Sequence, residues 1–151
     1  MHGARIVWTA NGDFAKGQYS RAHEWHFDGG TVVPASSSPS VVPLPFSDAA
    51  AVDPEEAFVA SLSSCHMLWF LDLARRAGFV AERYEDHAHG VMERKEGRLS
   101  ITRVTLRPRV IWRVAPDRDR EAALHHAAHE ECFIANSVRT EIAIELEGET
   151  A

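Results

Sequence analysis

The sequence predicts an α+β fold in which small β-sheets pack against two helices. Three observations lead to this prediction: β-forming segments occur before, between and after the helical segments, one long apolar segment has clear helix start and stop signals, and a second helical segment is rich in histidine. The predicted order is two or three strands, a helix, two strands, a helix and a last strand, without internal repeats. A chain of 151 residues is expected to form a single domain over residues 1–151.

The N-terminal part predicts a β-hairpin followed by a long loop. Residues 4–10 are rich in β-branched and aromatic side chains, and residues 18–27 alternate polar and large side chains. Asn11-Gly12 between them is a strong turn signal. Residues 34–52 are rich in Pro, Ser and Ala, which predicts a loop of a length that is often functional in compact domains.

The long apolar segment predicts a helix that begins after Asp53 and ends at Gly78. Asp53 can cap the free amides of the first turn, and Pro54 suits the first helical position. A helix of roughly 24 residues would be about 36 Å long. It is apolar or small on nearly all sides as far as Leu73. We therefore expect a buried central helix that is covered from several directions, including by a second subunit.

The C-terminal part predicts a second hairpin, a second helix and a last strand. Residues 84–94 and 98–113 supply the hairpin, in which Pro108 implies a sheet edge or a bulge. Residues 117–132 predict the helix. Residues 141–147 alternate charged and apolar side chains cleanly, as a half-buried strand does.

Composition narrows the possible classes of function. Hydrophobic residues make up 45% and charged residues 25% of the chain, as in ordinary globular proteins. The net charge of -6 makes nucleic acid an unfavourable partner, because phosphate binding needs a basic face. No apolar run approaches the ~20 residues of a membrane span, and the N-terminus lacks the regions of a signal peptide. We therefore expect a cytoplasmic protein without a membrane partner.

Two cysteines, Cys65 and Cys132, raise the question of redox chemistry. A thiol can be oxidised and restored, and a second thiol within reach turns that reaction into a cycle. The alternative for Cys65 is a small buried hydrophobic residue, a common role for cysteine. The sequence alone leaves open whether the two sulfurs meet, since a disulfide requires a narrow range of geometry.

Activation of Cys65 would need groups from other parts of the chain. Glu55 lies ten residues earlier on the same predicted helix, where a carboxylate is usually a partner of the helix start. His66 is a poor direct base for Cys65, because successive helix residues do not face each other. A cysteine in the middle of a helix also lacks the N-terminal dipole that lowers a thiol pKa. Arg21 and Lys16 are the candidate activating cations.

The surroundings of Cys132 allow a rival interpretation. His125, His129 and Cys132 fall at positions i, i+4 and i+7, which share one helix face and would suit a metal ion. A fourth ligand would have to come from elsewhere, and a histidine-rich helix is more often simply solvated. The chain has neither the nucleophile elbow of serine hydrolases nor a glycine-rich phosphate loop.

Two stretches, Asp53–Cys65 and Ala128–Asn136, give the chain a resemblance to the OsmC/Ohr family of thiol-dependent peroxidases, nearer to its OsmC-like branch. The family shows an (Asn/Asp)-Pro-Glu helix start, a cysteine ten residues after that glutamate, and a second cysteine in an Ala-His-x-x-Cys setting. All three features are present here. The predicted order of strands and helices agrees over essentially the whole length.

The resemblance implies a fold and a reaction. The fold would have two antiparallel β-sheet regions wrapped around long central helices in an intertwined homodimer, with sites at the subunit interface. Cys65 would be the peroxidatic cysteine and Cys132 the resolving one, and Glu55 would pair with an arginine that holds the thiolate. The substrate would be an organic hydroperoxide or hydrogen peroxide. An external dithiol would be the reductant, with no cofactor and no metal.

The chain departs from the family pattern at three places. The loop from Pro34 to Val52 contains no arginine, so Arg21 is the expected partner of Glu55. Lys16 is the runner-up, because lysine cannot form a bidentate pair with a carboxylate. Phe133-Ile134 stand where many members have Pro-Tyr, and His66 stands where many have an apolar residue. The alternative function is a non-catalytic OsmC-like stress-response, small-ligand-binding or redox-sensing protein.

Overall fold

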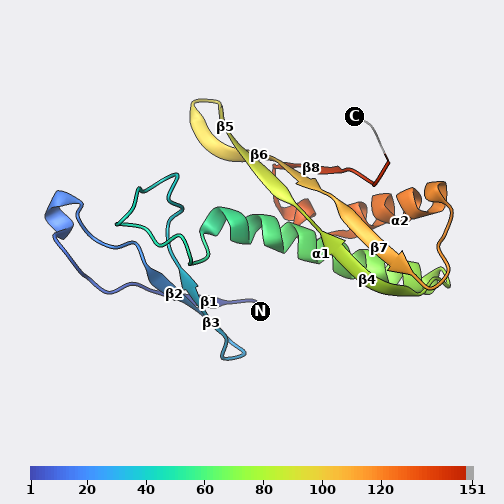
Figure 1. The fold of residues 1–151 in the computed structure, drawn as a ribbon, viewed down its shortest axis with the longest axis horizontal. Helices are drawn as coiled ribbons and strands as arrows, with labels where there is room; N and C mark the ends of the chain where they lie inside the picture. Colours follow the sequence, from blue (N-terminus) through green and yellow to red (C-terminus); the bar gives the residue numbers. More distant parts are fainter. Residues whose placement is uncertain (149–151) are drawn as a thin grey trace. The chain divides into compact units, whose positions relative to one another are not determined.

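The computed structural model of this chain describes residues 1–148. The structure contains an α+β fold with the element order β1-β2-β3-α1-β4-β5-β6-β7-α2-β8 (Figure 1), so the predicted fold class is confirmed. Two compact units, Met1–Ala57 and Phe58–Ala151, make up the chain and are described separately below. The single domain over residues 1–151 stays a prediction.

The first unit holds one small antiparallel sheet. Its strands, in the spatial order β1-β2-β3, are β1 (Ala4–Val7), β2 (His23–Phe27) and β3 (Val32–Ala35). The predicted pairing of the first two strands is therefore present, but the loop that joins them runs over residues 8–22 and includes a short 3-10 helix, η1 (Phe14–Lys16).

Asn11-Gly12 does not form the predicted tight hairpin turn. Instead, the Asn11 side chain accepts a hydrogen bond from the Ser20 amide at 2.6 Å and thereby holds the two sides of the long loop together. Gly12 has a φ of 60°, and a Cβ at this position would lie 2.2 Å from the carbonyl oxygen of Gln18. The dipeptide is therefore needed for a close backbone approach inside the loop.

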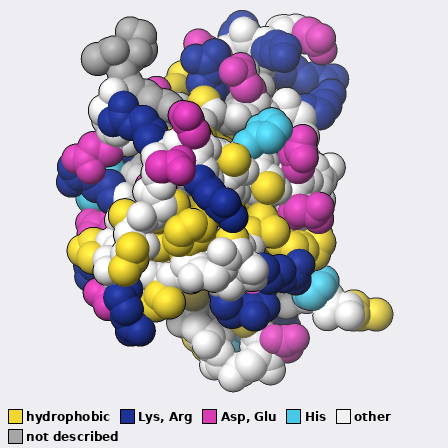
Figure 2. Space-filling model, turned by 90° about the vertical axis from the view of Figure 1, so that its right-hand side faces the viewer, with side chains coloured by type: hydrophobic (Ala, Val, Ile, Leu, Met, Phe, Trp, Pro, Cys, Tyr) yellow, Lys and Arg dark blue, Asp and Glu magenta, His cyan; other side chains and the backbone are white. Residues whose placement is uncertain are grey.

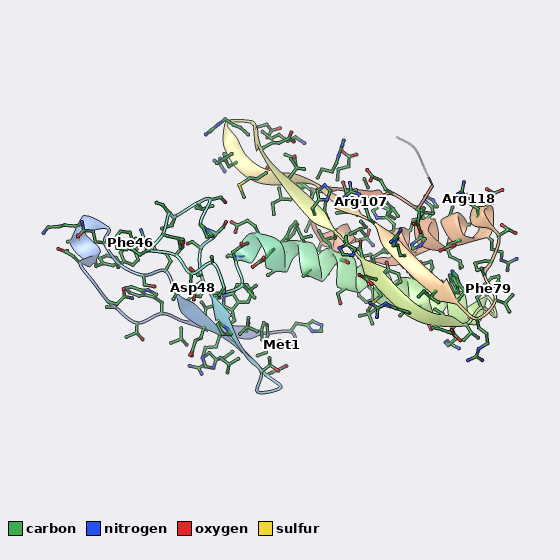
Figure 3. All side chains as sticks on the ribbon, viewed as in Figure 1. Met1, Phe46, Asp48, Phe79, Arg107 and Arg118 are labelled. Carbon is green, nitrogen blue, oxygen red and sulfur yellow. The ribbon has the colours of Figure 1, made fainter. Side chains whose placement is uncertain are left out.

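The long loop predicted over residues 34–52 is confirmed after the end of β3. Buried Ser36 organises it, because its hydroxyl accepts a hydrogen bond from the Asp48 amide at 2.9 Å. The carbonyl of Phe46 accepts the amide of Arg21 at 2.9 Å. Figure 3 labels Phe46 and Asp48 in this loop.

Helix α1 (Pro54–Arg76) matches the predicted helix closely. Its start is a capping box: Asp53 accepts the amide of Glu56, and Glu56 accepts the amide of Asp53, both at 2.8 Å. Gly78, with a φ of 86°, follows its end and supplies the left-handed residue that terminates many helices.

The chain itself buries α1 along one stripe only, which corrects the expectation of a helix buried on nearly all sides. Leu62, His66, Phe70 and Ala74 are buried, at a spacing of four residues, whereas Leu68 is 61% exposed.

By length and composition α1 also meets the requirements of a membrane span, with a mean hydropathy of 1.4. This corrects the expectation that the chain has no apolar run long enough to span a membrane. The buried stripe packs against strands and the second helix, as the stripe of a core helix does.

The second unit contains two further sheets. Its strands are β4 (Ala81–Asp86), β5 (His89–Lys95), β6 (Arg98–Leu106), β7 (Pro108–Trp112) and β8 (Glu141–Ile144). One sheet pairs β4 with β7, and the other has the order β5-β6-β8, in which β6 and β8 are parallel.

The predicted second hairpin is present, but each of its two long strands is divided. The break before β7 coincides with Pro108, which cannot donate to a sheet ladder. Opposite it, Asp86 ends β4 and accepts the amide of Arg107 at 2.6 Å (Arg107 is labelled in Figure 3). Two small sheets therefore replace one long ribbon.

The core of the second unit forms where α1 meets the strands. Leu62, Val104 and Leu106 are its buried centre. Helix α2 (Arg118–Glu131) is capped by Asp117, whose carboxylate accepts the amide of Arg120 at 2.8 Å, in agreement with the predicted helix. Figure 2 shows acidic and basic side chains intermixed around hydrophobic ones on the face that it presents.

Candidate thiol site

Cys65 lies in the middle of α1 and is half-buried. The serines around it are engaged in structural contacts. Ser61 donates to the carbonyl of Phe58 at 2.7 Å, and Ser63 donates to the carboxylate of Asp86. These hydroxyls therefore tie this part of α1 to its own backbone and to β4.

Cys132 follows the last residue of α2 and is buried, with 1% of its surface exposed. Its amide donates to the carbonyl of His129 at 3.4 Å, which closes the helix end. Its Sγ accepts the amide of Ala135 at 3.4 Å. The sequence places Cys132 at this helix end, and the backbone contacts on both sides fix where its sulfur points.

Both cysteines are free thiols, and the Cys65 thiol lies within hydrogen-bonding range of the Cys132 sulfur. Burial raises the pKa of Cys132, and the neighbouring Cys65 thiol raises it further, against the opposing effect of the Ala135 amide. A raised pKa keeps Cys132 protonated at neutral pH. The pair is therefore asymmetric: Cys65 is the more accessible thiol, and Cys132 is held in the protein interior beside it.

Glu55 has a different environment. It lies in the first turn of α1, and its carboxylate makes no hydrogen bond or ion pair with any residue between 1 and 148. The capping role falls to Asp53 and Glu56 instead. Ten residues of helix between Glu55 and Cys65 correspond to about 15 Å along the axis, so the carboxylate does not reach the thiol.

The two candidate cations are both engaged within the first unit. The guanidinium of Arg21 donates to the carbonyls of Gly17, at 3.0 Å, and Tyr19, and it lies 3.6 Å from the centre of the Tyr19 ring. Lys16 pairs with Asp13 at 3.2 Å. Within one copy of the described chain, neither cation forms an ion pair with Glu55.

His125 of α2 is buried against His66 of α1, an arrangement that differs from the metal site considered above. Nδ1 of His125 lies 3.0 Å from Nε2 of His66 on α1, and both residues are 1% exposed. In the described part of the chain, no three His, Cys, Asp or Glu side chains converge in a way that could hold a metal ion. His125 therefore connects two helices.

Burial keeps this histidine pair neutral. It lowers the pKa of His66 to about 4, with His129 adding to the effect, and it lowers the pKa of His125 to about 3, with His66 adding to the effect. A neutral imidazole carries one donor and one acceptor nitrogen. One ring therefore donates to the other across the 3.0 Å contact.

An α+β chain that carries two free thiols side by side, one half-exposed and one buried, has the features of a two-cysteine thiol protein. A family model described as "OsmC-like protein" matches residues 47–147. This chain therefore belongs to the OsmC-like protein family, and the resemblance seen in the sequence is confirmed.

Solved structures agree with this assignment. An OsmC-like protein of unknown function from Vibrio cholerae O1 biovar eltor is 48% identical, with a TM-score of 0.94 over 97% of this chain and 98% of that one. An organic hydroperoxide resistance protein from Elizabethkingia anophelis is 18% identical, with a TM-score of 0.73 over 97% and 93%. The organic hydroperoxide resistance protein OhrB of Bacillus subtilis is 23% identical, with a TM-score of 0.65 over 96% and 98%. The two organic hydroperoxide resistance proteins share the fold of this chain. A comparison with curated proteins finds no match.

Sequence reasoning found both thiols but missed the contact between His66 and His125. The two residues are 59 positions apart, and no spacing rule connects residues on different helices. The one available signal was the presence of two histidines on predicted helices that both lead to a cysteine. The sequence predicts a solvated helix face for His125, with a metal site as the rival interpretation, whereas its side chain is buried.

Proposed function

We propose that this protein is a cytoplasmic, cysteine-based peroxidase that reduces organic hydroperoxides and, as a second substrate, hydrogen peroxide. The observation that carries the proposal is the asymmetric pair of thiols, with Cys65 half-exposed and Cys132 buried beside it. A peroxide can reach the first sulfur, and the second sulfur is already in place to react with the product. Membership of the OsmC-like family supports the same reaction.

The proposed reaction balances without a cofactor. The Cys65 thiolate attacks one peroxide oxygen, the O–O bond breaks, and the alcohol leaves with a proton, so that Cys65 becomes a sulfenic acid. The Cys132 sulfur then attacks the Cys65 sulfur, the S–O bond breaks, and the hydroxide leaves as water with the thiol proton of Cys132. An external dithiol reduces the resulting disulfide by exchange.

We further propose that the activating ion pair forms in a homodimer. Within one described copy Glu55 has no partner, while α1 leaves apolar surface such as Leu68 uncovered. In the homodimer, a bidentate pair between Arg21 and the Glu55 that the second copy supplies would lie beside the Cys65 of the first copy, where it would orient the peroxide and stabilise the thiolate. Arg21 would exchange its present backbone contacts for that pair.

A steady-state assay with cumene hydroperoxide and a dithiol tests the proposal. The wild-type protein is expected to turn over, and Cys65→Ser is expected to lose at least ~10³-fold in rate, because the nucleophile is gone. A Cys65→Ser variant that keeps the wild-type rate would overturn the proposed reaction. Analytical ultracentrifugation of the same samples measures the proposed dimer independently.

A second function, a non-catalytic redox sensor, is favoured by one observation. Neither Arg21 nor Lys16 pairs with Glu55 in one described copy, so the thiol lacks its cation unless a second copy supplies it. A sensor would form the Cys65–Cys132 disulfide once with peroxide but show no peroxidase turnover with a dithiol present. The same assay, followed by mass spectrometry of the disulfide, separates the two functions.

A further inference from the structure

The contact between His66 and His125 is the one directional polar contact that joins the stripe of α1 to α2 among the described hydrogen bonds. The two rings are nearly parallel, with an angle of 4° between their planes and 5.3 Å between their centres. On its other side the His125 ring stacks on Phe70, with 3.9 Å between centres and 15° between planes. The rings of His66, His125 and Phe70 therefore pack together between the two helices.

The pair is costly for the protein to bury. Nδ1 of His66 and Nε2 of His125 have no hydrogen-bond partner within residues 1–148. A buried nitrogen without a partner costs about 1–3 kcal/mol relative to a satisfied one. Leucine or phenylalanine at both positions would avoid this cost. What an apolar pair could not supply is a bond with a defined length and direction between the two helices.

The histidine pair lies close to both cysteines along the chain, so a bond between the histidines would control the separation of the two sulfurs. His66 directly follows Cys65 on α1, and His125 lies seven residues, or two turns, before Cys132 on the face of α2 that leads to it. A sliding or rotation of α1 against α2 at the histidines would therefore move the sulfurs apart. Disulfide formation tolerates little movement, because the two Cα atoms must lie about 4.4–6.8 Å apart.

We propose that His66 and His125 are positioning residues that fix the register of α1 against α2 and thereby set the effective concentration of the Cys132 thiol at the Cys65 sulfur. The inference rests on the proposed disulfide chemistry of this thiol pair. The histidines do not touch the peroxide or exchange protons with it. They act through the helices that carry the two sulfurs.

The test compares variants that keep the interhelical bond with variants that remove it. Gln at position 66 and Asn at position 125 carry polar atoms near the imidazole nitrogens that form the contact, so His66→Gln and His125→Asn should retain it. His66→Leu and His125→Leu should fill the space without it. His126→Ala, which changes the exposed neighbouring histidine of α2, is the matched control.

The readout is the equilibrium between the dithiol and disulfide forms in dithiothreitol redox buffers, followed by mass spectrometry and combined with urea unfolding of each variant. We expect His66→Leu and His125→Leu to disfavour the Cys65–Cys132 disulfide about tenfold, which is ~30 mV for a two-electron couple. The Gln, Asn and His126→Ala variants should stay near the wild-type value. The double variant His66→Leu/His125→Leu should remain at least as stable in urea as the amide variants, because it buries no orphaned nitrogen. Each single leucine variant leaves the contact nitrogen of the remaining histidine without its partner and should be less stable than the double variant.

Leucine variants that fold and keep the wild-type redox equilibrium would overturn the inference. A parallel loss in the amide variants would also overturn it, since the bond would then not be the cause. If a single leucine variant does not fold, the double variant His66→Leu/His125→Leu, which restores an apolar pair, provides the same comparison. Failure of the proposed function can be distinguished from failure of this inference, because the redox equilibrium is measured without peroxide. A wild-type protein that forms the disulfide but reduces no peroxide would refute the proposed function and leave this inference intact.

Discussion

The thiol pair and the charged residues expected to activate it are supplied differently by this chain. Cys65 and Cys132 lie side by side within the second unit, so one copy holds both sulfurs that a disulfide needs. In the first unit, Glu55 has no ionic partner among the described residues, and Arg21 is bound to backbone carbonyls and to the Tyr19 ring. Under the proposed reaction, disulfide formation would need one chain only, whereas activation of the thiolate would need a second copy.

After removal of the nucleophile itself, the largest expected effect on rate concerns the buried sulfur. Cys132→Ser should react with one equivalent of cumene hydroperoxide at a near wild-type rate but lose about 10²-fold in steady-state turnover with a dithiol, because no internal thiol resolves the sulfenic acid. Trapping with dimedone should label Cys65 in this variant and not in the wild type. Unchanged turnover would show that the reductant attacks Cys65 directly and that the pair is not a catalytic unit.

The next effect tests the charged residues that are proposed to activate Cys65. Arg21→Ala should slow the first oxidation of Cys65 by about 10- to 100-fold, because a charge-assisted hydrogen bond to the proposed carboxylate is lost. Lys16→Ala is the matched control and should change the rate less than twofold, since Lys16 forms an exposed pair with Asp13. Stopped-flow fluorescence or thiol titration measures the rate. The reverse order of effects would make Lys16 the activating cation.

A third effect, on stability and not on rate, is expected in acid. The folded-state pKa values of His66 and His125 are lowered to about 4 and about 3, below the value near 6.5 of an unfolded chain. Above pH 6.5 both states are neutral and the stability is complete. As the pH falls from 6.5 towards 4, the unfolded chain binds protons first, so stability falls by about 3 kcal/mol for each histidine.

Urea unfolding at pH 7 and pH 4.5 measures this loss. The variant His66→Leu/His125→Leu should show a smaller decrease between the two pH values, because the groups that titrate differently are gone. His126→Ala should decrease as the wild type does. Equal decreases in all three proteins would contradict neutral burial of the pair.

The smallest effect is expected at the start of α1. Asp53→Ala removes one of the two bonds of the capping box and should cost about 1 kcal/mol in unfolding free energy. It should leave the Cys65–Cys132 redox equilibrium unchanged, because the thiols are held by contacts further along the helix. Thermal unfolding and the redox titration together measure both quantities. A large shift in the redox equilibrium would show that the helix start and the thiols are coupled.

Local chemistry made much of the fold predictable. The limits of α1 followed from Asp53, Pro54 and Gly78, whose roles at helix ends depend on neighbouring residues alone. The strand limits were less accurate. Asn11-Gly12 has the composition of a hairpin turn, but the backbone contact with Gln18 and the bond to Ser20 place it inside a longer loop.

The candidate site was also predictable only in part. The two cysteines are rare and stand out in any reading, so Cys65 and Cys132 could be named in advance. The pairing of His66 with His125 could not, since it depends on how α1 and α2 pack. The partner proposed for Glu55 could not be identified from the sequence either, because the pair would depend on contacts between two copies of the chain.

The hydrogen bond from the Ala135 amide to the Cys132 sulfur gives the protein an internal reporter. A Cys132 sulfur that bonds to Cys65 must turn towards α1, so its contact with the Ala135 amide weakens. The amide of Ala135 should therefore exchange its hydrogen with solvent faster in the oxidised protein. The segment after α2 would then carry the oxidation state of a buried sulfur outward to a surface that other molecules can read.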